Sequence, residues 1–174
     1  RGRFAPSPTG PLHAGSLVAA LASFLDARHH NGKWQLRIDD IDPPRAVAGS
    51  INAITEALIA HGLVWNGPIL FQSQSSPYYD RALDQLVSSG WLFRCLCTRA
   101  TLEPNGCCGR NCRDHDVSAE TPHSLRIKVA PEWLAGFRDR FLGEQPAPAE
   151  TAAKDFVVRR RDGIYAYQLA AAID

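Results

Sequence analysis

Apolar positions in the first half of the chain repeat with a helical period in three segments. Between residues 16 and 29 they follow the i, i+3, i+4 spacing of one helix face, at Leu17, Ala20, Leu21, Phe24 and Leu25. The same pattern predicts helices over residues 48–61 and 78–89. A glycine follows each of these two segments, which is common just after a helix end.

Two other segments have the pattern of strands. A short apolar strand starts at the first residues and ends at Phe4 and Ala5, and "KWQLRIDD" (residues 33–40) alternates apolar and polar positions. Strand, helix, strand and helix in this order predict βαβ units built on a parallel sheet, and therefore the α/β class.

After Cys112 the pattern changes. We expect strands or strand-and-turn segments at "HSLRIKV", "FRDRFLG", "DFVVRRRDG" and "IYAYQLAAAID" (residues 123–129, 137–143, 155–163 and 164–174). The Pro- and Ala-rich "GEQPAPAETAAKD" (residues 143–155) has the composition of a linker.

Composition limits the function. The chain has 174 residues, 19 basic and 18 acidic side chains and a net charge of +1, so any nucleic-acid surface must be local. The longest apolar run is well short of the roughly 18 residues that span a bilayer, and the N-terminus is not a signal peptide. We therefore expect no membrane partner and a cytoplasmic location. Methionine is absent even at position 1, so we expect the sequence to be part of a longer product.

The stretch "RFAPSPTGPLHAGSL" (residues 3–17) leads from the first strand into the first helix. The first N–H groups of a helix are unpaired and favour anions. Gly10 and Gly15 would let a base or phosphate approach the backbone, and His13 and Ser16 would add hydrogen-bond donors. A turn with a helix N-cap and an exposed His13 is the alternative, because neither a Walker motif nor GxGxxG is present.

All five cysteines fall between Cys95 and Cys112. Their number and close spacing disfavour a disulfide framework and favour a tetrahedral zinc site. Free buried thiols are the alternative.

Three segments together resemble one enzyme family. Residues 3–17 resemble the HIGH-motif loop of class I aminoacyl-tRNA synthetases, with His13–Ser16 ("HAGS") at the motif itself. "LRIDDIDPPR" (residues 36–45) and "RRRDGIYAYQLAAAID" (residues 159–174) resemble two signatures of the glutamate-specific branch. The "DIDPPR" wording and the Cys-x-Cys insert resemble a compact paralogue in that branch that lacks an anticodon-binding domain.

The resemblance implies a Rossmann-type parallel sheet with an inserted zinc-binding, acceptor-type subdomain. The implied limits are residues 1–92 for the first half of the catalytic domain, 93–155 for the insert and 156–174 for the return. The family's KMSKS-like loop and a second substrate-binding arginine lie beyond the counterpart of Asp174.

The resemblance also assigns site residues. It implies that glutamate is bound by Arg3, Phe4, Ala5, Pro6, Ser7, Asp39 and Tyr167. ATP is bound by Thr9, Gly10, His13, Gly15 and Ser16, of which His13 and Ser16 are also catalytic. Asp39 stands where the family usually has a glutamate, so its contact with the substrate ammonium shifts or uses water. A core aromatic on a strand is the alternative for Tyr167. Asp40 and Asp42 with Arg45 have two interpretations, a charged turn or carboxylates that bind Mg²⁺, and the turn is favoured for Asp42. The resemblance implies a structural role for them.

The implied zinc ligands are Cys95, Cys97, Cys108 and Cys112, with Cys107 spare and the metal structural. Local basic residues are candidates for an RNA surface, namely Arg94, Arg99, Arg110, Arg113 and Arg159–Arg161.

The implied reaction uses ATP and Mg²⁺ to convert glutamate to glutamyl-adenylate without tRNA. The same enzyme, which we expect to be a monomer, then transfers glutamate to queuosine in the anticodon of tRNA(Asp). Three alternatives remain: a truncated glutamyl-tRNA synthetase that charges a tRNA 3′ end, a nucleotidyltransferase acting on another small acid, and a non-catalytic zinc-stabilised RNA-binding module.

Overall fold

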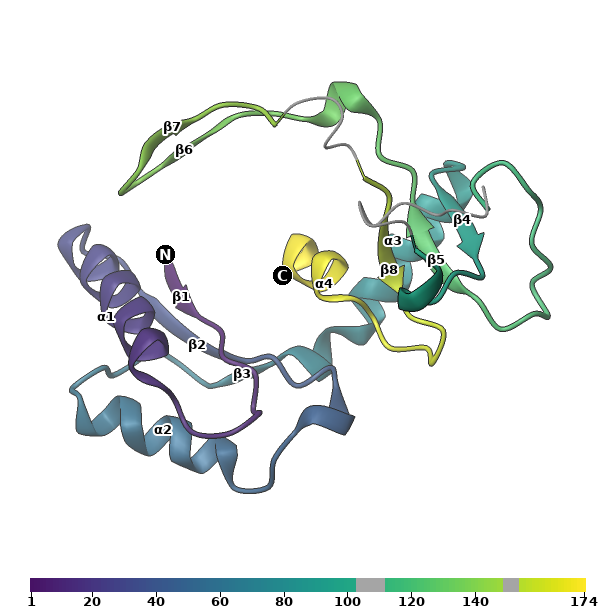
Figure 1. The fold of residues 1–174 in the computed structure, drawn as a ribbon. Coiled ribbons are helices and arrows are strands. Elements are labelled where there is room, and N and C mark those ends of the chain that lie inside the picture. Colours follow the sequence, from purple (N-terminus) through teal and green to yellow (C-terminus); the bar gives the residue numbers. More distant parts are fainter. Residues whose placement is uncertain (103–111, 149–153) are drawn as a thin grey trace. The chain divides into compact units, whose positions relative to one another are not determined.

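The computed structural model describes residues 1–102, 112–148 and 154–174, and it divides into two compact units, Arg1–Pro77 and Tyr78–Asp174 (Figure 1). Each unit has its own sheet. These two units do not test the domain limits expected from the resemblance, which stay a prediction.

The first unit confirms the predicted βαβ arrangement. Its sheet has the parallel order β1 (Gly2–Phe4), β2 (Trp34–Ile38) and β3 (Leu70–Phe71). Helix α1 (Ala14–His29) connects β1 to β2, and α2 (Ser50–Ala60) lies between β2 and β3 in the chain (Figure 1). Gly62 has a φ of +71°, which fits a glycine that ends a helix.

The core of this unit forms around β2. Trp34, Leu36 and Ile38 are fully buried, together with Ala20 of α1 and Ile54 of α2. The predicted strand is confirmed, and as the central strand of a parallel sheet it is buried on both faces. The polar residue that this burial traps on β2, Arg37, belongs to the candidate site.

Gly2 allows β1 to lie close to α1. A Cβ at this position would come within 2.9 Å of both the Ala27 Cβ and the Ser23 carbonyl oxygen. The Trp34 indole N–H donates to Ser23 Oγ over 2.9 Å, which satisfies the one polar atom of this buried ring.

The second unit begins along α3 (Ser76–Ser88), whose first residues lie in the first unit. It has an antiparallel sheet in the order β4 (Leu92–Cys95), β5 (Ser124–Ile127) and β8 (Phe156–Arg159). A separate hairpin pairs β6 (Phe137–Asp139) with β7 (Gly143–Gln145). Short 3₁₀ turns cover Pro43–Arg45, Gln72–Ser75, Arg99–Thr101 and Pro131–Trp133.

Two expectations for the second half are wrong in part. The C-terminal segment is not a strand from residue 164 onward. It makes one β-bridge, between Arg159 and Tyr165, and then forms helix α4 (Tyr167–Ile173). Leucine and alanine favour a helix, and α4 buries Leu169 and Ala170. The start of the expected linker is strand β7, because Asp139 and Gly143 build a tight turn from β6.

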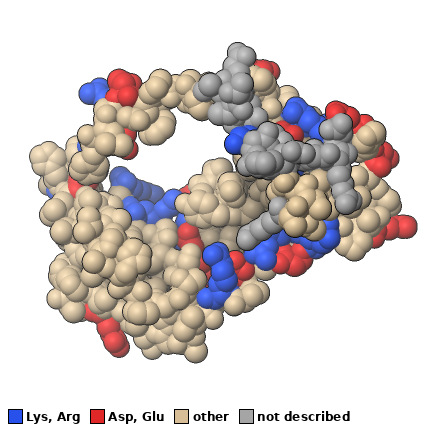
Figure 2. All heavy atoms as spheres, viewed as in Figure 1, with Lys and Arg blue, Asp and Glu red and all other residues tan. Residues whose placement is uncertain are grey.

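Among the described helices, none is both long and apolar enough to cross a membrane. Figure 2 shows Lys and Arg side chains beside Asp and Glu in several places, while much of the visible face carries neither.

Candidate active site and cysteine cluster

The loops after β1 and β2 meet at one edge of the parallel sheet. The Asp39 backbone N–H donates to the Pro6 carbonyl over 3.0 Å, so the residue that follows β2 is tied to the loop that follows β1. The Pro8 carbonyl accepts from the Val47 N–H and from Ser50 Oγ, each over 2.8 Å. Ligands of open α/β sheets bind outside the carboxyl ends of the strands, which is where these loops lie.

His13 is the N-cap of α1, and its ring binds Ser16 twice. Nδ1 accepts from the Ser16 backbone N–H over 3.2 Å, and Nε2 lies 3.1 Å from Ser16 Oγ. A neutral ring with its hydrogen on Nε2 satisfies both contacts and leaves the Ser16 hydroxyl hydrogen available to a ligand. His13 is therefore both the helix N-cap that the sequence suggested and the hydrogen-bond partner of Ser16, the other candidate donor.

Gly15 allows the His13 ring to fold over the first turn of α1. A Cβ on Gly15 would come within 3.1 Å of the His13 Cε1 atom and 3.2 Å of Nδ1. Gly10 has a φ of +140° with open space at its Cβ position, so its backbone conformation is the constraint there. The backbone N–H groups of Ala14 and Gly15 have no acceptor among the described residues.

Asp39 forms a buried two-point ion pair with Arg37. Arg37 Nε lies 2.6 Å from Asp39 Oδ1, and Arg37 Nη2 lies 3.1 Å from Oδ2. The two side chains are 5% and 6% exposed. Arg37 was not predicted as a site residue. The available signal was its spacing, because residues two apart on a strand share a face and can pair.

The remaining predicted glutamate-binding residues lie in both units. Arg3 and Ser7 are exposed, whereas the Phe4 ring is stacked on Trp34 with 6.3 Å between centroids and packs against the core. The Phe4 ring is therefore part of the core packing of the first unit. Tyr167 is the first residue of α4 in the second unit and is 66% exposed, so its alternative assignment as a core aromatic on a strand is wrong.

The acids after Asp39 hold the turn that follows β2. Asp40 accepts from the Ser73 backbone N–H over 2.8 Å and from Ser73 Oγ over 2.7 Å. Asp42 Oδ2 pairs with Arg45 Nε over 2.6 Å. The interpretation of Asp42 as part of a charged turn is confirmed.

Three of the predicted zinc ligands lie together in the second unit. The Sγ atoms of Cys95, Cys97 and Cys112 are all within 4.8 Å of one another. Cys95 and Cys112 are buried, and they pack against Phe93 and Val117. A tetrahedral zinc ion with Zn–S distances of about 2.3 Å places its sulfur ligands about 3.8 Å apart, so this group fits three of four positions. Cys107 and Cys108 lie outside the described residues.

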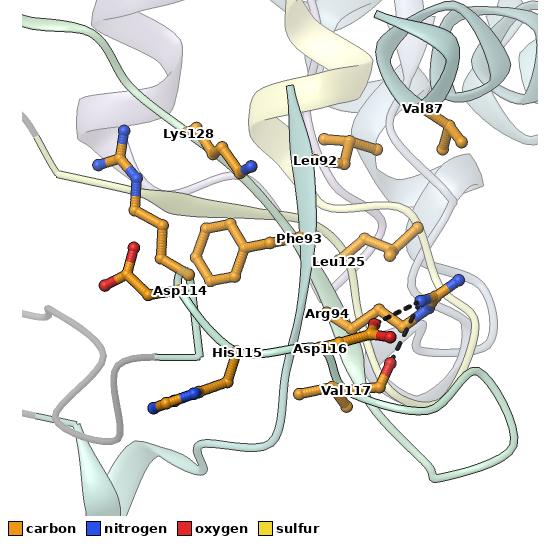
Figure 3. A pocket seen from close by; sticks show the side chains of 11 residues that line it. Val87, Leu92, Phe93, Arg94, Asp114, His115, Asp116, Val117, Leu125 and Lys128 are labelled. Carbon is orange, nitrogen blue, oxygen red and sulfur yellow. Dashed lines mark hydrogen bonds and ion pairs between the residues drawn. The ribbon is translucent and has the colours of Figure 1, made fainter. Parts of the chain in front are cut away.

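A cavity of about 350 Å³ lies beside this cluster, with Phe93, Leu125 and Lys128 in its lining (Figure 3). Two arginines that the sequence suggested for RNA contact line it, but each has an acidic partner. Arg94 is 3.8 Å from Asp116 and donates to the Val117 carbonyl, and Arg113 is 3.4 Å from Asp155 (the Arg94 contacts are dashed in Figure 3). Arg110 and the Arg99 side chain lie outside what the structure describes.

In the second unit, the surroundings of Tyr165 and of Asp139 shift the pKa values of these side chains. The pKa of Tyr165 is raised by burial and then by its 2.7 Å hydrogen bond to Asp80 and the charge of that residue. The pKa of Asp139 is lowered because the backbone N–H groups of Leu142 and Phe141 donate to its carboxylate.

The sequence and the fold both match known tRNA synthetases. The family model for class I tRNA synthetases (E and Q), catalytic domain, matches residues 1–174. The chain is 45% identical to the Glutamyl-Q tRNA(Asp) synthetase of Photobacterium profundum and 47% identical to that of Pseudomonas putida. Each comparison covers 99% of this chain, which spans 56% and 58% of those relatives' lengths.

Two solved structures have the same fold. The glutamate tRNA ligase of Elizabethkingia meningosepticum, solved in complex with its amino acid, is 29% identical with a TM-score of 0.81. The glutamate-tRNA synthetase of Elizabethkingia anophelis is 29% identical with a TM-score of 0.82. Both comparisons cover 99% of this chain, and 40% and 41% of the respective structures. From the match along its whole length, the chain belongs to the catalytic-domain family of class I tRNA synthetases (E and Q).

Proposed function

We propose that the protein containing this chain activates glutamate with ATP and transfers it to queuosine in the anticodon of tRNA(Asp). The observation that carries the proposal is the identity of 44–47%, over nearly the whole chain, to proteins named Glutamyl-Q tRNA(Asp) synthetase. The meeting of the β1 and β2 loops at the carboxyl edge of the sheet supports it, because small ligands bind at such edges.

Glutamate binds at this edge in the proposed function. The Arg3 guanidinium binds a substrate carboxylate with two parallel hydrogen bonds, and the exposed Ser7 hydroxyl adds a third donor. Asp39 binds the substrate ammonium. Arg37 donates to both Asp39 oxygens, which fixes the direction of the carboxylate. Phe4–Pro6 complete the pocket with their backbone, and the assignment of Tyr167 to glutamate binding stays a prediction.

ATP lies over the start of α1, where Thr9, Gly10 and Gly15 allow close approach of its phosphates. A glutamate α-carboxylate oxygen attacks the α-phosphorus in line, the bond to the bridging oxygen breaks, and pyrophosphate leaves. His13, Ser16 and the N–H groups of the first helical turn stabilise the charge that develops on the phosphate, and Mg²⁺ enters with ATP to screen the leaving pyrophosphate. No protein nucleophile is needed.

Transfer to RNA then follows. A hydroxyl of the queuosine base attacks the activated carbonyl and releases AMP. Bases of a single-stranded loop can turn outward and enter a pocket, which paired stems do not allow. Zinc held by Cys95, Cys97, Cys112 and Cys108 would have a structural role, since four thiolates leave no open coordination position for chemistry.

The test is ATP–pyrophosphate exchange by the full-length protein in the absence of tRNA. Exchange that requires glutamate supports the proposal. Exchange that requires a different acid would indicate a nucleotidyltransferase, and no exchange with any acid would indicate an RNA-binding module without catalysis.

A further inference from the structure

Three consecutive arginines at the end of β8, of which Arg159 is the last residue of the strand, line a groove in the second unit. The groove has a volume of about 270 Å³ and lies between residues 119–123, which precede β5, and residues 159–163. Strands β5 and β8 are paired, with Leu125 opposite Arg159, so the two walls are held by the sheet. Glu120 is the one acidic residue in a lining that contains Arg159, Arg160 and Arg161.

The three arginines differ in their partners. Arg160 Nη2 lies 2.6 Å from Asp162 Oδ2, so its charge is compensated within the chain. Arg159 Nε donates to the Gly163 carbonyl over 3.3 Å, and its guanidinium lies 5.7 Å from the centre of the Tyr165 ring. Arg161 Nη2 donates to the Leu96 carbonyl over 2.8 Å. Neither Arg159 nor Arg161 has an acidic partner among the described residues.

These contacts also orient the two guanidinium groups. An arginine side chain that moves freely loses conformational entropy when it binds a phosphate. A side chain already held by a hydrogen bond to a backbone carbonyl loses less, so its binding to the phosphate is more favourable. Each guanidinium uses one N–H group in this way and keeps the others for a ligand. Leu96 lies between Cys95 and Cys97, so Arg161 joins the groove to the loop that carries two of the candidate metal ligands.

We propose that Arg159 and Arg161 form a phosphate-binding groove for the RNA backbone, beside the cysteine cluster. The proposal rests on the proposed function for the choice of RNA as the ligand. An oriented pair of guanidinium groups matches phosphodiester oxygens, which accept in a fork geometry. Arg94 and Arg113 are poorer candidates because Asp116 and Asp155 already compensate their charges.

The experiment measures binding of fluorescently labelled tRNA(Asp) to the full-length protein by anisotropy at several salt concentrations. Arg159→Gln and Arg161→Gln are each expected to raise the Kd about tenfold and to reduce the slope of log Kd against log salt by about one. The matched control is Arg138→Gln, which removes one charge from the β6–β7 hairpin, where Arg138 lies 3.6 Å from the exposed Glu144. Its Kd is expected to change less than about twofold.

Unchanged affinity and salt slope in both groove variants would overturn the proposal, as would an equal loss in Arg138→Gln. Metal content and thermal unfolding show whether Arg161→Gln disturbs the cysteine loop. If it does, the Arg159→Gln variant is the deciding one, because the Arg159 side chain contacts Gly163 and Tyr165 and has no hydrogen bond to that loop among the described residues. Glutamate-dependent pyrophosphate exchange is expected to be unchanged in the groove variants. If the unsubstituted protein shows no glutamate-dependent pyrophosphate exchange, the proposed function fails. The tRNA-binding measurements still test the groove, because they do not depend on that exchange.

Discussion

Arg37 and Asp39 form an ion pair inside the first unit, with Nε–Oδ1 and Nη2–Oδ2 distances of 2.6 and 3.1 Å. Both side chains are almost fully buried, at the carboxyl end of the central strand. The acid assigned to the substrate ammonium is therefore also part of the core of the unit. Its substitution is expected to affect stability as well as catalysis.

We predict that Asp39→Asn lowers the free energy of unfolding by about 3 kcal/mol, because it leaves the Arg37 charge buried without its carboxylate partner. Chemical denaturation measures this. The control is Asp42→Asn, whose partner Arg45 is 69% exposed and whose pair is worth less than about 1 kcal/mol. Equal losses in the two variants would contradict the structural role given to the buried pair.

We predict that His13→Ala slows adenylate formation at least tenfold, which corresponds to about 1.4 kcal/mol, with little change in glutamate affinity. It also removes the N-cap of α1, at a cost of about 1 kcal/mol in stability. His13→Ser separates the two effects, because serine caps helices well but has no ring. We expect it to recover stability and not rate, as measured by thermal unfolding and single-turnover kinetics. Recovery of the rate by serine would refute a role for the imidazole.

The parts of the fold that rest on local periodicity could be predicted from the sequence. The apolar spacing over residues 16–29 and the glycine at 62 locate α1 and the end of α2. Tertiary contacts decided the rest. The extended backbone ends at the β-bridge of Tyr165. Residues 167–173 then form a helix, which buries the side chains of Leu169 and Ala170.

The candidate site shows the same division. The pairing of His13 with Ser16 is local, three residues apart in one helical turn, and the sequence singled out both residues. The spacing of Arg37 and Asp39 allows the two side chains to pair, but the burial of the pair depends on which strand of the sheet is central, and no single-strand pattern gives that. The approach of Cys112 to Cys95 and Cys97 depends on how the intervening chain returns, so spacing could only suggest it.

We predict that the purified full-length protein holds close to one zinc ion. Cys95→Ser, Cys97→Ser and Cys112→Ser are each expected to lose the metal and lower the melting temperature, because their Sγ atoms lie in one group. Elemental analysis measures the metal content. Cys107→Ser is expected to retain zinc, and loss there with retention in Cys108→Ser would reverse the choice of fourth ligand.

We predict that Tyr165 makes stability fall at alkaline pH. Its pKa in the folded protein is raised above the ordinary value of 10.0 by burial and by Asp80, so the folded state holds the phenol proton more tightly than the unfolded state does. The resulting stabilisation is complete below about pH 10 and is lost as the pH rises through the raised pKa.

Denaturation at increasing pH tests this, with ultraviolet titration of the tyrosinate signal alongside. Tyr165→Phe is expected to flatten the alkaline part of the stability profile, and Asp80→Asn is expected to move the tyrosine titration toward its ordinary range. An unchanged profile in Tyr165→Phe would show that another group is responsible.

The most direct test of the central claim is transfer of labelled glutamate by the full-length protein to tRNA(Asp) isolated with and without queuosine. The proposed function predicts labelling only of tRNA that carries the modified base, and labelling that survives removal of the 3′-terminal adenosine. Charging of tRNA(Glu) at its 3′ end, with no labelling of queuosine-containing tRNA(Asp), would contradict it.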